Sequence, residues 1–243
     1  PQSFFPNAGG NAFPSTRWSA IRDSSNRESP TCRESLERMA NLYWRPVYAY
    51  IRGKWGRSDE EAKDLTQEFF LALIEKDFME KLSPDRGRFR SYVKAALDNF
   101  VRLQHRTDNR QKRGGGIRVL SLDMAAGCDP VSSETPEQTF LREWARSVLR
   151  EAHAELEREC RGSGDEKRYE IFCLHDVTRP DGEDLSYEGL ARRFGLTVPA
   201  VTKHLYSARQ RFRELVRLSV RETLATDDDV ENELRELFSE ASW

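Results

Sequence analysis

The sequence contains no long apolar run and only a modest share of apolar residues. Hydrophobic residues make up 37% of the 243 positions, and charged residues make up 33%. A helix that spans a membrane needs about 20 consecutive apolar residues, and no stretch approaches that length. Residues 1–14 contain neither the basic segment nor the apolar segment of a secretory signal. We therefore expect a cytoplasmic protein without a membrane span.

Cysteine and histidine are scarce, with four residues of each type. The cysteines form no C-x-x-C pair, and no histidine stands at metal-ligand spacing from them. The sequence shows no nucleophile–base pair, and the run Gly114–Gly116 lacks the Lys-Ser or Lys-Thr that follows in a phosphate-binding loop. We expect reduced thiols that serve as packing residues, no metal, no cofactor and no enzymatic activity.

An excess of positive charge is also absent. The chain has 39 Lys and Arg residues against 41 Asp and Glu residues, and its formal net charge is -2. Binding of nucleic acid regardless of sequence depends on uncompensated Lys and Arg. The composition therefore argues against a protein that coats nucleic acid, and any contact with DNA must come from local clusters.

Apolar residues recur at spacings of three and four along most of the chain, which is typical of amphipathic helices. No period-two run bounded by turn residues indicates a strand. The predicted fold is all-α, with two small helical domains joined by a flexible linker and a helix-turn-helix in the second domain. The predicted division is a disordered leader at 1–15, a first domain at 16–106, a linker at 107–136, a second domain at 137–224 and an acidic C-terminal extension at 225–243.

The segment from Leu185 to Arg213 carries the most specific pattern in the chain. Gly195 stands between two helical segments whose apolar residues include Leu190, Val201 and Leu205. A helix held at a steep angle by such a turn can enter the major groove of DNA. Its exposed face would present side chains to base edges and phosphates, namely Pro199, Thr202, Lys203, Tyr206, Ser207 and Arg209. An ordinary helical hairpin with solvated charges is the alternative interpretation.

Charges of opposite sign are segregated within the first unit. Residues 59–80 hold eight acidic residues against two lysines, whereas residues 86–118 hold ten basic residues against two aspartates. Basic residues interleaved with aromatic ones can bind single-stranded nucleic acid, and an acidic helix suits a basic protein partner. Both runs can also be solvated helix faces without a partner.

Four segments, in this order, resemble motifs of the extracytoplasmic-function sigma factors. Asp64-Leu-Thr-Gln-Glu-Phe-Phe-Leu71 resembles the family's polymerase-docking helix, which typically reads D-L-x-Q-E-x-F. Asp85-Arg-Gly-Arg-Phe-Arg-Ser-Tyr92 resembles the loop and helix start that follow, and Asn99 falls where an asparagine often reads the −10 promoter element. Val201-Thr-Lys-His-Leu-Tyr-Ser-Ala-Arg209 resembles the helix that recognises the −35 element.

The resemblance implies a protein that binds core RNA polymerase, through the clamp of its largest subunit, and promoter DNA in duplex and single-stranded form. It implies polymerase binding by Asp64, Leu65, Gln67, Glu68, Phe69 and Phe70. It implies −10 DNA binding by Arg86, Arg88, Phe89, Arg90, Lys94, Asp98, Asn99, Arg102 and Arg106. It implies −35 DNA binding by Thr197, Pro199, Thr202, Lys203, Tyr206, Ser207, Arg209 and Arg213. The implied function is promoter recognition, DNA melting and transcription initiation.

Two further features of the sequence give hypotheses about regulation. Thr66 lies inside the docking motif, and its phosphorylation by a Ser/Thr kinase would add negative charge to the polymerase-binding surface. An anti-sigma protein is the alternative regulator. The extension at 225–243 contains an acidic amphipathic pattern that would cap the DNA-binding domain, contact a partner or remain solvated.

A second interpretation of the whole chain is a helix-turn-helix transcriptional regulator that binds duplex DNA without polymerase. It predicts a dimer and a palindromic target. The sequence indicates neither of these, and this interpretation gives the first unit no role.

Overall fold

The structure of the chain is a computed structural model that describes residues 30–75, 89–112, 134–180, 185–224 and 230–240. These residues form helices and no strand, which confirms the predicted all-α fold. None of these helices is long and apolar enough to cross a membrane. The predicted leader at 1–15 and residues 113–133 of the predicted linker lie outside the described residues.

The first predicted domain contains the helices α2 (Pro30–Trp55), α3 (Asp59–Glu75) and α4 (Phe89–Lys112). A reciprocal cap starts α3, because the Glu61 N–H donates to Ser58 Oγ at 3.3 Å and the Ser58 N–H donates to Glu61 Oε2 at 3.1 Å. Three acidic residues in its first turn also suit the positive end of the helix dipole. α4 ends at Lys112, beyond the predicted domain boundary at 106.

The second predicted domain contains α5 (Pro136–Gly162), α6 (Glu166–Phe172), the π-helix η3 (Cys173–Thr178), α7 (Tyr187–Phe194) and α8 (Val198–Arg221). Thr135, Ser186 and Thr197 cap the N termini of α5, α7 and α8 with their side-chain oxygens. Gly195 ends α7 with a φ of 64°, a left-handed conformation that glycine adopts without steric strain. A short turn therefore connects α7 to α8.

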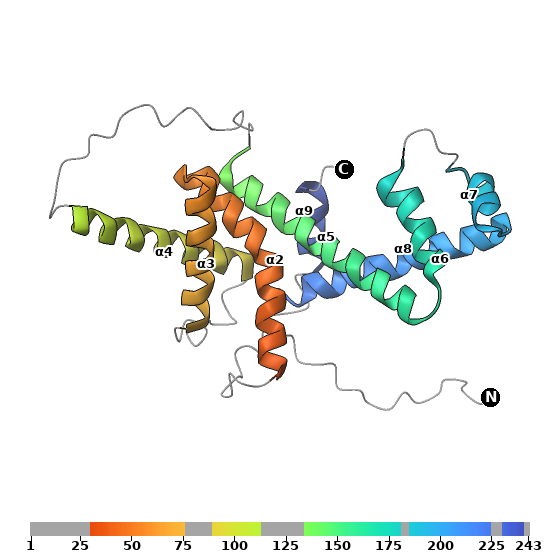
Figure 1. Ribbon diagram of the computed structural model, residues 1–243, viewed down its shortest axis with the longest axis horizontal. Coiled ribbons are helices and arrows are strands. Elements are labelled where there is room, and N and C mark those ends of the chain that lie inside the picture. The colour runs from red at the N-terminus through yellow and green to blue at the C-terminus, as the bar shows by residue number, and fades with distance from the viewer. Residues whose placement is uncertain (1–29, 76–88, 113–133, 181–184, 225–229, 241–243) are drawn as a thin grey trace.

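The final described helix, α9 (Val230–Glu240), lies against α5 and α8. Figure 1 shows α3 and α4 at one end of the molecule and α6 and α7 at the other, with α2, α5 and α9 between them. Val230 and Leu237 of α9 are buried, and so is the acidic Glu233. The extension is therefore packed into the fold at this helix.

One hydrophobic core joins helices from both sides of the linker segment. α2 makes with α5 the most extensive helix–helix contact in the described chain. The Tyr43 ring of α2 lies 5.1 Å from the Phe89 ring of α4 and 6.4 Å from the Phe140 ring of α5, measured between centroids. A second, smaller cluster holds α6, α7 and α8 together. The sequence did not indicate that the two predicted domains share a core.

Candidate nucleic-acid interface

The residues predicted to dock on polymerase divide into two faces of α3. Asp64, Gln67 and Glu68 are exposed and lie on one side, and Leu71, which is 56% exposed, continues this side by one further turn. We call these four residues the α3 docking face. Leu71 thus adds apolar area to a side of the helix that is otherwise polar. Leu71 was not among the predicted site residues, although its spacing of three, four and seven from the others indicates the same face.

The opposite side of α3 is part of the core. Phe69 and Phe70 are buried, and the ring of Phe70 stacks on Trp44 at 5.8 Å between centroids. The Phe69 ring meets the Phe100 ring of α4 at 5.7 Å in an edge-on arrangement. These two phenylalanines therefore support the docking face from behind, and Leu65 is half-buried beside them.

Thr66 is fully buried on the inner side of α3, with 0% of its surface exposed. Its Oγ1 donates to the backbone oxygen of Ala62 at 2.6 Å. A kinase needs the hydroxyl in its own active site, and a buried phosphate would bring about two negative charges into an apolar core. In this structure the threonine predicted as a phosphorylation site is therefore not accessible.

The residues predicted to bind −10 DNA are distributed unevenly on α4. Asn99 and Arg102 are exposed. Phe89 and Arg90 are buried, with 4% and 5% of their surface exposed. Arg86, Arg88 and the side chain of Arg106 lie outside the described part of the chain. A single accessible face containing all of the predicted residues is therefore not present in this structure.

Lys94 and Asp98 of α4 are half-buried, Lys94 near α5 and Asp98 against α2. The Lys94 ammonium lies 6.0 Å from the centre of the Phe140 ring. Lys54 Nζ of α2 lies 3.0 Å from Asp98 Oδ2 and 3.4 Å from Glu137 Oε1 of α5. The Lys54 ammonium thus joins α2, α4 and α5. Tyr50 also donates to Glu137 at this point, and burial raises the pKa of the Tyr50 phenol to about 12.

The residues predicted to bind −35 DNA lie on α8 and at its N-cap, and most of them are accessible. Exposed side chains on one face include Pro199, Thr202, Lys203, Tyr206 and Arg213, and Thr197 at the N-cap is exposed too. Tyr206 is 65% exposed, whereas tyrosine side chains are more often partly buried. Gln210 is exposed on the same face, one turn further along α8. It was not among the predicted site residues, although its spacing of four from Tyr206 and seven from Lys203 places it on this face.

Arg209 and Ser207 are turned toward the protein. Arg209 donates to both carboxylate oxygens of Asp176, at 2.7 Å and 2.8 Å. Burial would raise the pKa of Asp176, but the hydrogen bonds from Arg209 and His175 outweigh it, so the pKa lies below its usual range. Ser207 Oγ lies 3.5 Å from Arg168 Nη1. The π-helix η3, which supplies Asp176, therefore anchors α8 through Arg209.

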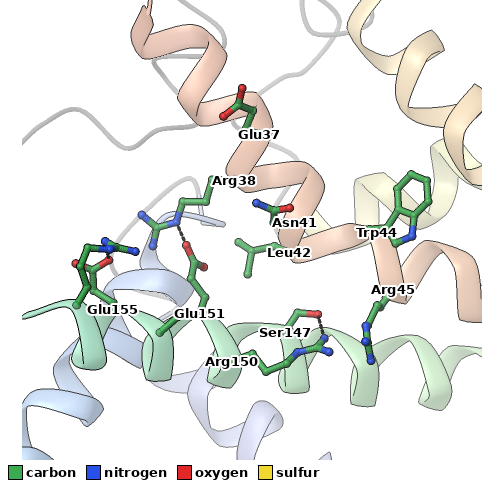
Figure 2. Close-up of a pocket in the computed structure, with 12 residues that line it drawn as sticks. Glu37, Arg38, Asn41, Leu42, Trp44, Arg45, Ser147, Arg150, Glu151 and Glu155 are labelled. Carbon is green, nitrogen blue, oxygen red and sulfur yellow. Dashed lines mark hydrogen bonds and ion pairs between the residues drawn. The ribbon is translucent and has the colours of Figure 1, made fainter. Parts of the chain in front are cut away.

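A cleft of about 710 Å³ lies between α2 and α5. Figure 2 shows Arg45 of α2 extending toward Arg150 of α5. Neither guanidinium forms an ion pair with any described residue, and burial together with the nearby positive charge of Arg45 lowers the pKa of Arg150. At the other end of the cleft Arg38 is paired with Glu151. The boundary between α2 and α5 is therefore partly neutralised and partly cationic.

The model of the ECF sigma factor family matches residues 36–217, which is about three quarters of the 243 residues. Neither the curated proteins nor the solved structures gave a match. The matched range contains the α3 docking face, α4 and the exposed face of α8, and it ends before α9.

Proposed function

The chain belongs to the ECF sigma factor family and is a sigma factor that directs RNA polymerase to promoters; from this premise we propose how its residues divide that work. Sigma factors are transcription initiation factors that catalyse no reaction themselves. The α3 docking face binds the clamp of the largest polymerase subunit. The exposed face of α8 binds the −35 element as duplex, and α4 binds the −10 element as opened strand.

The observation that carries this proposal is the exposure of polar and apolar groups together on the α3 docking face. Asp64, Gln67 and Glu68 supply acceptors and negative charge, and Leu71 supplies apolar area in the same stripe. Glu68 also accepts from Gln104 Nε2 of α4 at 2.8 Å, which fixes the position of its carboxylate. Charged groups steer a basic partner, and a desolvated leucine contributes affinity.

On α8, the exposed side chains divide between base and phosphate contacts. Thr202, Lys203 and Tyr206 lie in the turns nearest the N terminus of the helix, where a recognition helix meets base edges. Arg213 lies two turns further on and contacts a phosphate. On α4, Asn99 and Arg102 contact the opened strand, and binding energy from such contacts offsets a cost of a few kcal/mol for each base that leaves the stack.

The proposal is tested with core RNA polymerase and two matched leucine variants. Leu71→Ala removes the apolar part of the docking face, whereas Leu218→Ala removes an exposed leucine of α8 that is 43% exposed. We expect Leu71→Ala to weaken binding to the polymerase by about tenfold and Leu218→Ala to leave it unchanged. The measurement is a titration of labelled full-length protein with core enzyme, followed by fluorescence anisotropy.

Equal affinities for the two variants would remove the docking assignment. Transcription from a library of randomised promoters tests the function as a whole. A regulator that binds duplex DNA without polymerase would support no initiation in this assay and would leave the α3 docking face without a role.

A further inference from the structure

Arg90, at the start of α4, is buried between residues of α5 and α9. The centre of its guanidinium lies 5.3 Å from the centroid of the Trp144 ring of α5. On the other side, Arg90 Nε lies 2.6 Å from Glu233 Oε1, and Nη2 donates to Glu233 Oε2 at 3.0 Å. Nη2 also pairs with Glu236. Both carboxylates belong to α9, so the C-terminal extension supplies all the anions that Arg90 contacts in these ion pairs.

These carboxylates engage the N–H groups through which Arg90 would bind a DNA phosphate. Carboxylates and phosphates bind the guanidinium fork in the same way, through charge-assisted hydrogen bonds from its N–H groups. The side chain of Arg90 is 5% exposed and that of Glu233 is 1% exposed. A phosphate cannot reach Arg90 while α9 is docked, so the two occupants are mutually exclusive.

Two properties make this contact easy to open. A buried ion pair gains little net free energy, because the loss of hydration offsets much of the attraction. The 2.6 Å contact between Arg90 Nε and Glu233 Oε1 also lacks the geometry of a hydrogen bond. α9 is 11 residues long, and helices shorter than about 12 residues are marginal in isolation. Its docking therefore depends on tertiary contacts, namely the burial of Val230 and Leu237 against the core and the pairing of Glu233 and Glu236 with Arg90.

We propose that α9 is an autoinhibitory latch whose carboxylates hold Arg90 away from promoter DNA until the helix undocks. This proposal rests on the proposed role of α4 in DNA binding, and on Arg90 as one of its DNA contacts. Independently of α9, α4 is also tied to the second predicted domain, since the Phe89 N–H donates to the Thr223 carbonyl at 3.3 Å. Release of α9 would free the guanidinium of Arg90 from both carboxylates.

The latch is tested in the full-length chain with two single substitutions that remove one negative charge each from α9. Glu236→Gln removes a partner of Arg90 from a side chain that is 45% exposed, so the fold should tolerate it. Glu231→Gln is the matched control, because Glu231 is 61% exposed and pairs with Arg217 of α8 instead. The double variant Glu233→Gln/Glu236→Gln removes both partners of Arg90.

Two measurements are made on each variant without polymerase. The affinity for a mixed-sequence single-stranded DNA is measured by anisotropy, and the opening of α9 is measured by amide hydrogen exchange. We expect Glu236→Gln to bind DNA several-fold more tightly and the double variant about tenfold more tightly, with faster exchange in α9. Adding Arg90→Ala to the double variant should abolish the gain, and Glu231→Gln should match the wild type.

Three outcomes would overturn the latch. Equal gains for Glu231→Gln and Glu236→Gln would show a general effect of net charge. Unchanged exchange in α9 of the double variant would show that these carboxylates do not hold the helix. Faster exchange without tighter DNA binding would show that α9 does not compete with DNA for Arg90. The single variant Arg90→Ala then shows whether Arg90 contacts DNA at all. If Arg90→Ala weakens binding, only the competition is wrong; if it does not, the DNA role of Arg90 is wrong too.

Discussion

The helices α4 and α8 are each 24 residues long, and both carry residues assigned to promoter DNA, but they present those residues in different ways. On α8 the assigned side chains point mainly into solvent. On α4 only Asn99 and Arg102 are exposed among the described side chains of this set, while Arg90 and Asp98 are held by ion pairs to other helices.

This difference has an energetic meaning. When an exposed donor of α8 binds DNA, it exchanges water for a phosphate or base, and counterions are released. For Arg90 to bind DNA, it would first have to lose its carboxylate partners, of which Glu233 is already removed from water. The side chains of α8 proposed to read duplex are therefore accessible in this structure, as are Asn99 and Arg102 of α4, whereas Arg90 becomes accessible only after it separates from its partners on α5 and α9.

The largest expected effect is a loss of stability when Trp144, the α5 residue whose ring lies against Arg90, is truncated. Trp144 is 1% exposed, and Trp144→Ala should lower the free energy of unfolding by about 3–5 kcal/mol. Tyr206→Ala, on the open face of α8, should change it by less than about 0.5 kcal/mol. Urea unfolding followed by far-UV circular dichroism measures both. Similar losses in the two variants would mean that the surroundings of Arg90 are no more closely packed than the open face of α8.

Two threonines sharpen the same contrast, because each donates from its hydroxyl to a carbonyl four residues earlier. Thr66 is buried in α3, and Thr202 is exposed on α8. Thr66→Glu should lower the free energy of unfolding by about 2–3 kcal/mol, since it places a carboxyl in the core. Thr202→Glu should leave unfolding nearly unchanged and weaken duplex binding by charge repulsion. Thermal melts and DNA titrations distinguish these results, and a stable Thr66→Glu protein would contradict the burial of Thr66.

The arginines of α8 separate anchoring from DNA binding. Arg209→Ala leaves Asp176 without its guanidinium partner and should cost about 1–2 kcal/mol of stability. Arg213→Ala should leave stability unchanged and reduce the slope of log affinity against log salt concentration by about 1. The first is measured by urea unfolding and the second by DNA binding at several salt concentrations. An unchanged salt slope for Arg213→Ala would remove its phosphate contact.

The smallest expected effect is a change in stability at low pH. Because the folded state holds the pKa of Asp176 below its unfolded value, the Arg209–Asp176 pair contributes stability above the unfolded pKa of about 3.9, and that contribution is lost as the pH falls through the folded pKa. Asp176→Asn should flatten the acid limb of the stability profile below about pH 4. Urea midpoints between pH 3 and pH 6 check this. A profile identical to that of the wild type would mean that this pair adds nothing.

Local patterns in the sequence predicted which segments are helical and which side of each helix is buried. The spacing of apolar residues predicted the all-α fold, which the structure confirms. The same spacing indicates the burial of two residues that the family motifs marked as sites. Thr66 lies in register with Ala62, Phe69 and Leu73, and Arg90 lies in register with Val93 and Leu97, so both follow the inward side of their helices. The likeness to family motifs had assigned both residues to sites without regard to this register.

The sequence did not predict which helices pack on one another. Arg90 meets Glu233 at a separation of 143 residues along the chain, and Arg38 meets Glu222 at a separation of 184. A hydrophobic period shows which side of a helix turns inward, but it does not show which other helix covers that side. For this reason the sequence left three alternatives open for the C-terminal extension, and it did not indicate the core that α2 shares with α5.

The sequence alone determined the helices, their caps and the composition of each helix face, because these depend on interactions within a few residues. Only the tertiary structure decided that the C-terminal helix lies on Arg90 and that α4 is covered where α8 is open. Those contacts form when distant segments together remove apolar surface and ionic groups from water, and that free energy depends on which faces meet.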